Sequence, residues 1–141
     1  MTVDSQGRIY IVGASENGLF VKDMGGTSYY QPNITKSPDA FIARFNACGV
    51  LQWSTYFGGQ ASLSTNIDDD IAYNVKVDNN DNIYVCGLTR ADLGGNSSTC
   101  GVPQNEGFPL CDLGGLAFFD GTYNGGYTDC FISKFDHSGY L

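Results

Sequence analysis

The chain has 141 residues, 42% of them hydrophobic and 13% aromatic, and a formal net charge of −8 at pH 7. This composition excludes a disordered chain of the low-hydrophobicity, high-charge kind, and an acidic chain without a Lys/Arg cluster argues against a nucleic-acid partner. No stretch approaches the roughly 20 apolar residues of a membrane span, so we expect no such span.

Two phrases occur twice in the chain, in the same order. Residues 3–13 return as residues 77–87, and residues 39–46 return as residues 129–136. Repeats in fixed order predict a repeat architecture. The chain starts within one copy and stops within another, while stacked repeats usually need about three units to bury a continuous core. We therefore expect the remaining blades of a larger chain, or other copies of this one, to complete the fold.

Short runs of β-branched and aromatic residues, each next to a cluster of turn-forming residues, predict strands throughout the chain. In chain order, the expected strands are 2–4, 9–13, 40–45, 50–57, 71–77 and 83–87, then one within the repeated phrase 129–136, with a stub at 140–141. No segment of any length shows helical periodicity. The sequence therefore predicts four strands in each complete unit.

Several of these strands are apolar on both faces, most clearly 9–12 and 41–43. A sandwich strand with one solvated face would alternate, and a solenoid coil is usually much shorter than the 74 residues that separate the first repeated phrase. The prediction is an all-β fold of antiparallel four-stranded propeller blades, with slightly under two blades present. Residues 1–59 form the partial first blade, and residues 60–141 form the second, with a long insertion loop at about 88–128 and a truncated last strand.

The repeated phrases resemble the bacterial SBBP-type β-propeller repeats. The resemblance is carried by the hairpin Val77–Gly87, by Phe108-Pro109, by Gly125–Ile132 and by Trp53–Gly59, whose wording is similar to versions in Bacteroidetes surface proteins. It implies a secreted or cell-surface protein, with export by the type IX route in many relatives. The family has no common catalytic residues, so the resemblance implies none here.

Five cysteines raise the expectation of an oxidising compartment. Cys100 and Cys111 are the best disulfide candidates, because both lie in the long second spacer, where closing a loop gains most. Cys86 and Cys130 stand where the first copy has Val12 and Ala40, so they either fill small buried positions or pair across neighbouring strands. One cysteine is left over in any pairing.

Carboxylates offer weak candidates for a calcium site, namely Asp68, Asp69, Asp70, Asp78 and Asp81. Neither acidic run matches an EF-hand loop. The first is expected to start a strand and to discourage edge pairing by its charge, and the second fits a hairpin turn. No other cofactor is expected.

The sequence contains no arrangement that predicts catalysis. The one histidine, His137, falls in a predicted turn, and no zinc-type Cys-x-x-Cys pair is present. We therefore expect a non-catalytic segment of a secreted or cell-surface propeller, a structural or adhesive interaction module with a possible glycan or protein ligand on its loops. One alternative is a self-assembling protein whose blades are completed by strand exchange between copies. Another is the non-catalytic part of a larger propeller enzyme, such as a glycan-active one.

Overall fold

A computed structural model describes residues 1–35, 38–59, 69–90, 107–111 and 128–141. Within these ranges the chain is all-β, with antiparallel strands only. Seven strands are present: β1 (Thr2–Val3), β2 (Ile9–Ser15), β3 (Asp39–Phe45), β4 (Leu51–Phe57), β5 (Ile71–Val77), β6 (Ile83–Thr89) and β7 (Asp129–Phe135). The described residues contain no helix that could cross a membrane.

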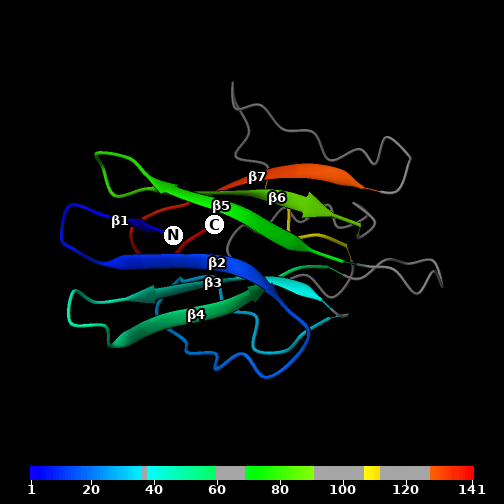
Figure 1. Ribbon diagram of the computed structural model, residues 1–141, viewed down its shortest axis with the longest axis horizontal. Helices are drawn as coiled ribbons and strands as arrows, with labels where there is room; N and C mark the ends of the chain where they lie inside the picture. The colour runs from blue at the N-terminus through cyan, green and yellow to red at the C-terminus, as the bar shows by residue number, and fades with distance from the viewer. Residues whose placement is uncertain (36–37, 60–68, 91–106, 112–127) are drawn as a thin grey trace.

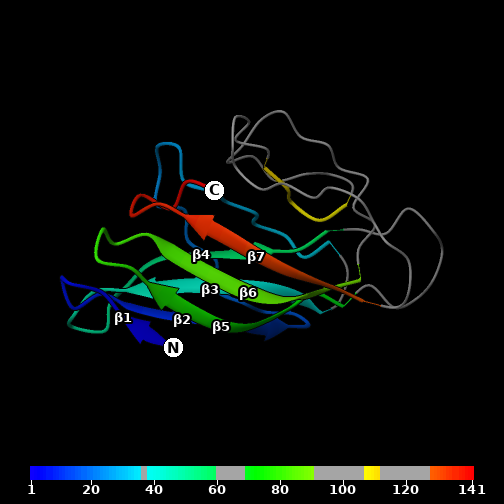
Figure 2. The same cartoon turned by 90° about the horizontal axis from the view of Figure 1, so that it is seen from above.

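The strands form two separate sheets, with the orders β1-β2-β3-β4 and β5-β6-β7. In Figure 1 the sheets lie one above the other, and β5 of the upper sheet runs beside β2 of the lower one. Figure 2 shows β4 and β7 along one side of the molecule and β1, β2 and β5 along the other. Neither sheet closes on itself, and the arrangement is that of an incomplete propeller, as predicted.

The strand predictions are confirmed with small shifts of boundary. β2 and β6 each run two residues past the predicted end, to Ser15 and Thr89, because each stays paired with its neighbour to that point. Tyr140 and Leu141, the predicted stub, form no strand. The blade boundary between residues 59 and 60 stays a prediction. Most of the predicted insertion loop lies outside the described residues.

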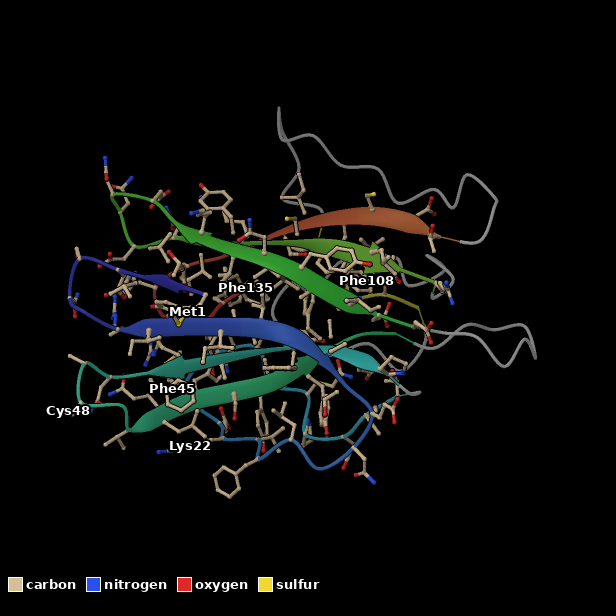
Figure 3. All side chains as sticks on the ribbon, in the orientation of Figure 1. Met1, Lys22, Phe45, Cys48, Phe108 and Phe135 are labelled. Carbon is tan, nitrogen blue, oxygen red and sulfur yellow. The ribbon has the colours of Figure 1, made fainter. Side chains whose placement is uncertain are left out.

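Aromatic side chains fill the space between the two sheets. Trp53 and Phe57 come from β4, and Phe131 and Phe135 come from β7, all nearly or fully buried. Two further buried aromatic rings, Tyr29 and Phe108, come from the connecting segments. In Figure 3 the labelled Phe135 lies between the sheets, whereas Cys48 lies at the tip of the β3–β4 hairpin. Burying these rings is the main stabilisation available to the pair of sheets.

Phe57 is the centre of this aromatic core. Its ring meets those of Tyr29, Phe108, Phe131 and Phe135 edge to face, with centroid separations of 5.5, 5.0, 5.7 and 5.3 Å. Edge-to-face pairs at this distance are favourable beyond the area they bury. Phe57 of the first sheet therefore contacts three rings from the second half of the chain: Phe131 and Phe135 of β7, and Phe108 of a connecting segment.

A glycine under each of two phenylalanines fixes how the rings lie on the sheets. Phe41 is paired with Gly13, and Phe131 with Gly87. A Cβ on Gly13 would lie 2.9 Å from the Phe41 ring, and one on Gly87 would lie 2.8 Å from the Phe131 ring. Glycine lets each ring lie across the neighbouring strand.

We expect Phe57→Ala to lower the free energy of unfolding by about 3–5 kcal/mol, since it removes a fully buried ring and leaves a cavity. Urea unfolding followed by tryptophan fluorescence measures this loss. Phe20→Ala is the matched control, because Phe20 is 76% exposed, and it should change the free energy by no more than about 0.5 kcal/mol. Equal losses in the two variants would contradict the central role of Phe57.

Candidate interaction surface

The outer face of the β5–β7 sheet, called here the open face, is covered by no described part of the chain. It carries the side chains that point away from the aromatic core, and Tyr73 and Ile132 on it are 66% and 80% exposed. The open face consists of Tyr73, Asn74, Lys76, Tyr84, Cys86, Cys130, Ile132 and Lys134. Large exposed apolar groups on one face of a sheet are a feature of interaction surfaces.

A shallow hollow of about 200 Å³ lies on the open face. Its walls include Tyr84 and Cys86 from β6 and Ile132 from β7. Lys134 Nζ lies 5.8 Å from the centroid of the Tyr84 ring, within reach of a cation–π interaction. β5 contributes Asn74 and Lys76 to the hollow, next to the irregular pairing between Ala72 and Asn74. The hollow is broad and open, so it suits a flat partner better than a small molecule.

The open face repeats a face that is buried in the other sheet. The repeat places Tyr84 and Ile132 where β2 and β3 carry Tyr10 and Ile42, which are 0% and 1% exposed. In the same way, the exposed Lys134 corresponds to Arg44, which is nearly buried and donates a hydrogen bond from Nη1 to the His137 carbonyl oxygen at 3.1 Å. In the first sheet, β5–β7 therefore cover this face. The equivalent face of β5–β7 themselves is open.

The opposite faces of the two sheets are also equivalent. The side chains of β6 and β7 that enter the core are Ile83, Val85, Phe131 and Phe135. Their counterparts in β2 and β3 are Ile9, Ile11, Phe41 and Phe45, which lie on the far side of the first sheet and are only half-buried or, for Ile11, 36% exposed. Each sheet thus has one face equivalent to that of Tyr10 and Ile42 and an opposite face equivalent to that of Phe131 and Phe135. The two sheets contact each other through unlike faces, one of each kind.

Four described turns, three in hairpins and one after β7, share one hydrogen-bond pattern. In each turn the first side chain, Asp4, Asn46, Asp78 or Asp136, accepts hydrogen bonds from the backbone N–H groups two and four residues later. This is the Asx turn expected of such residues. The fourth residue of each turn has a positive φ and is glycine in three of the turns. The sequence predicted turns at these places but not their common chemistry.

Hydrogen bonds hold the pKa of the turn aspartates low. At Asp78, hydrogen bonds from Asn82, Asn80 and Tyr84 outweigh desolvation and lower the pKa to about 2. At Asp4, burial raises the pKa, but the hydrogen bonds from Arg8, Gln6 and Tyr10 together outweigh it, and the net shift is downward. Both carboxylates are therefore charged at neutral pH and serve as acceptors for their own turns.

Asp81 joins the β5–β6 turn to the β1–β2 turn. Its carboxylate accepts hydrogen bonds from the Ser5 backbone N–H and hydroxyl at 3.2 and 3.0 Å. It also accepts from Gln6 Nε2 at 3.5 Å and forms an ion pair with Arg8 Nη2 at 3.2 Å. The carboxylate is mostly buried, with a side-chain exposure of 13%. This contact between sheets was not predicted from the sequence.

Two buried acids, Asp39 and Asp70, lie at the other end of the sheets, around Gly58. Asp39 and Asp70 are both 0% exposed, and a Cβ on Gly58 would lie 2.7 Å from Asp70 Oδ2 and 2.8 Å from Asp39 Cγ. Asp70 Oδ2 accepts from the Gly59 N–H at 2.8 Å, and Asp39 accepts from the Thr35 N–H at 2.8 Å. These hydrogen bonds offset part of the cost of burying the charges.

The nearby phenol of Tyr29 stays protonated. Burial is the main cause of its raised pKa, and the charges of Asp39 and Asp70 add to it. Its hydroxyl donates to Gln31 Oε1 at 2.9 Å, and Gln31 Nε2 donates to Asp39 Oδ2 at 3.1 Å. Asp39 is therefore tied to the aromatic core through a chain of hydrogen bonds.

The predicted calcium candidates do not come together among the described residues. Asp69 forms an ion pair with Arg90 at 2.7 Å, while Asp70, Asp78 and Asp81 accept the N–H donors given above. Asp68 lies outside the described residues. In the described ranges, no group of three or more His, Cys, Asp or Glu side chains could hold a metal ion. The expectation that the acidic run guards a strand edge is wrong for Asp70, because Asp70 is buried.

Cys86 and Cys130 meet neither of the two expectations, burial or pairing with each other. Cys86 and Cys130 are exposed rather than buried, since both lie on the open face, where their counterparts Val12 and Ala40 are covered by the second sheet. Neither is in a disulfide, and Cys48 is also a free thiol. The register pairs Cys86 with Ile132, which places Cys130 diagonally across from it. Cys100 lies outside the described residues, so the Cys100–Cys111 disulfide stays a prediction.

His137 lies in the turn that follows β7, as predicted, and is exposed. No acid or nucleophile is oriented by it in the described part of the chain; its backbone carbonyl, as noted, accepts from Arg44. Sequence reasoning missed the role of the residues that join the two sheets: Asp81, Asp70 and Arg44. For Asp81, the only signal in the sequence was its comparison with Gly7, the equivalent residue of the first copy.

The antiparallel hairpins and the two unclosed sheets agree with the comparison to protein families. A family model described as the SBBP β-propeller repeat matches residues 52–94. The match begins in β4, runs through β5 and β6, and so spans the junction between the two sheets. The chain is similar to this repeat over that range. Comparison with the curated proteins finds no match.

We expect acid to weaken the fold through Asp78. Its pKa is about 2 in the folded chain against an ordinary value of 3.8, so the unfolded chain binds protons first as the pH falls. The stabilisation is thus present above about pH 4 and is lost between about pH 4 and 2. Urea midpoints at pH 2.5 to 6 measure it. Asp78→Asn should keep the turn, as Asn46 does, and flatten the pH dependence; an unchanged dependence would contradict the assignment.

Thiol counting tests the remaining disulfide prediction. The denatured but unreduced chain should titrate with three thiols, Cys48, Cys86 and Cys130, and the reduced chain with all five cysteines. Peptide mapping of the unreduced chain should then give one linked peptide containing Cys100 and Cys111. Five thiols before reduction, in a chain prepared under oxidising conditions, would show that the prediction is wrong.

Proposed function

We propose that this chain is a non-catalytic segment of a secreted or cell-surface β-propeller and serves as a structural or adhesive interaction module. The observation that carries the proposal is the open face, whose β6 and β7 residues repeat those that the first sheet buries against β5–β7. A surface with a buried counterpart in the same molecule is built to be covered. The partner is a further blade, from the rest of a longer chain or from another protein.

The size and chemistry of the open face support a protein partner. Exposed Tyr73 of β5 and Ile132 of β7 supply apolar area, and Lys76 and Lys134 add charge on either side of Tyr84, with which both are paired. Aromatic residues are enriched in protein interfaces. A glycan or protein ligand on the loops is a further proposal, and the loops at 91–106 and 112–127 that would carry it lie outside the described residues.

Strand exchange between copies at the outer edge of β4 receives less support than face-to-face docking. The outer edge of β4 is already occupied by the chain itself, because Lys22 and Ser54 exchange two backbone hydrogen bonds of 2.9 Å, and the Tyr56 N–H donates to the Gln31 carbonyl at 3.2 Å. Strand addition needs an edge with free backbone groups. A partner therefore finds a face more readily than it finds that edge.

The native thiols give a direct test on intact cells that produce the protein and on their culture medium. A membrane-impermeant maleimide should label Cys48, which is exposed in a turn, and should label Cys86 and Cys130 at least about tenfold more slowly, because a partner covers the open face. Ile132→Asp should raise the labelling rate of Cys86 toward that of Cys48. Mass spectrometry of the labelled peptides gives the three rates.

Two results would overturn the proposal. Equal rates at the three thiols would mean that nothing covers the open face. Labelling of Cys48 only after cell lysis would place the protein inside the cell and refute the surface location. Ile132 is 80% exposed, so its replacement should leave the isolated fold intact, and circular dichroism of the variant checks this.

A further inference from the structure

Neighbouring turns in the two sheets are joined by one carboxylate, that of Asp81. The carboxylate belongs to the fourth residue of the β5–β6 turn, and its donors are Ser5, Gln6 and Arg8 of the β1–β2 turn. Because it is mostly buried and takes donors from three residues, the contact fixes the position of one turn against the other. We call this contact the turn clip.

The backbone at Asp81 indicates that the carboxylate itself is used. Asp81 has a φ of 60° and is the only residue other than glycine with a positive φ in the described ranges. Gly7, Gly49 and Gly139 occupy the fourth position of the other three turns, with φ values of 76°, 78° and 79°. Aspartate adopts this conformation less readily than glycine. Its side chain therefore contributes something that glycine does not.

The β5–β6 turn carries hydrogen-bond donors of its own at the positions equivalent to those of the turn clip. Asn79, Asn80 and Asn82 stand where the first turn has Ser5, Gln6 and Arg8. Asn79 and Asn80 are exposed, and Asn82 Nδ2 already donates one hydrogen bond to Asp78 Oδ2 at 2.9 Å, as Arg8 Nε donates to Asp4. Each asparagine amide has two N–H donors. The second turn can thus receive a carboxylate as the first turn does.

We propose that the blade which docks on the open face carries a carboxylate at the fourth position of its own first hairpin turn, hydrogen-bonded to Asn79, Asn80 and Asn82. This inference rests on the proposed function and adds the chemistry by which the partner is selected. A second copy of this chain has Gly7 at that position and lacks the carboxylate. Its far face, with Ile11 and Phe41, is otherwise of the kind that β5–β7 presents to the first sheet. The clip therefore favours an acidic-turn blade over a second copy.

Gly7→Asp provides a gain-of-function test, because it gives a second copy the missing carboxylate. Gly7→Asn is the matched control, since asparagine has the same size and tolerates the same φ but has no charge. A Cβ at this position would lie 3.3 Å from the Ala47 Cβ in both variants, so any strain is shared. Sedimentation velocity over a range of protein concentrations should show self-association at least about tenfold tighter for Gly7→Asp than for Gly7→Asn.

The labelling of native thiols separates the two proposals. In the associated Gly7→Asp protein, Cys86 and Cys130 should be protected from maleimide and Cys48 should not. Adding Ile132→Asp should abolish the association, and adding Asn80→Asp should reduce it to the level of Gly7→Asn. Equal association of the two Gly7 variants would overturn the clip alone. If Ile132→Asp left a Gly7→Asp association unchanged, the open face would not be the docking surface and the proposed function would fail as well.

Asp81→Gly tests the existing clip within one chain, and it serves if the Gly7 variants do not fold. Glycine suits the φ of 60° better than aspartate, so the substitution removes the carboxylate and relieves the backbone at once. We expect the urea midpoint of unfolding to fall, because Arg8 and Ser5 lose their acceptor. An equal or higher midpoint would mean that the carboxylate contributes nothing to holding the turns, and would overturn the inference.

Discussion

Contact between unlike faces of successive sheets is the constraint on which the rest of this structure depends. Trp53 and Phe57 of the first sheet pack against Phe131 and Phe135 of the second. Each sheet is too thin to bury its apolar side chains alone, so stability requires the pair. Since the aromatic cluster is made almost equally by both sheets and their connecting segments, neither sheet has a core of its own.

Polar contacts fix how the two sheets are aligned across this apolar core. Asp81 fixes the turns at one end, and Asp39 and Asp70 occupy the other end near Gly58. Arg44 reaches from the first sheet to the turn after β7. Apolar side chains tolerate some sliding, whereas hydrogen bonds to charged groups are directional and costly to leave unmade. The aromatic rings therefore hold the two sheets together, and the charged groups fix the position of one sheet against the other.

The repeated phrases in the sequence predicted the strands, their order and the antiparallel blades, because period and turn residues are local properties. They did not predict which face of each strand would be covered. Cys86 and Val12 occupy equal positions, yet Cys86 is exposed, since exposure depends on a neighbouring sheet. The burial of Asp70 was missed for the same reason: its hydrogen-bond donor, Gly59, belongs to a different part of the chain. Local residues predict strands, but only the packing of sheets determines a site.

The outer edge of β4 is closed to pairing with a further strand. Lys22 pairs with Ser54 along that edge and Gln31 with Tyr56, so the segment between β2 and β3 takes the backbone groups that another strand would use. Exposed edges are where β proteins recruit foreign strands and begin to aggregate. At this lateral edge the chain's own segment takes the row of backbone groups that a further strand would need. Extension by widening a sheet, the geometry of a fibril, is blocked on that side.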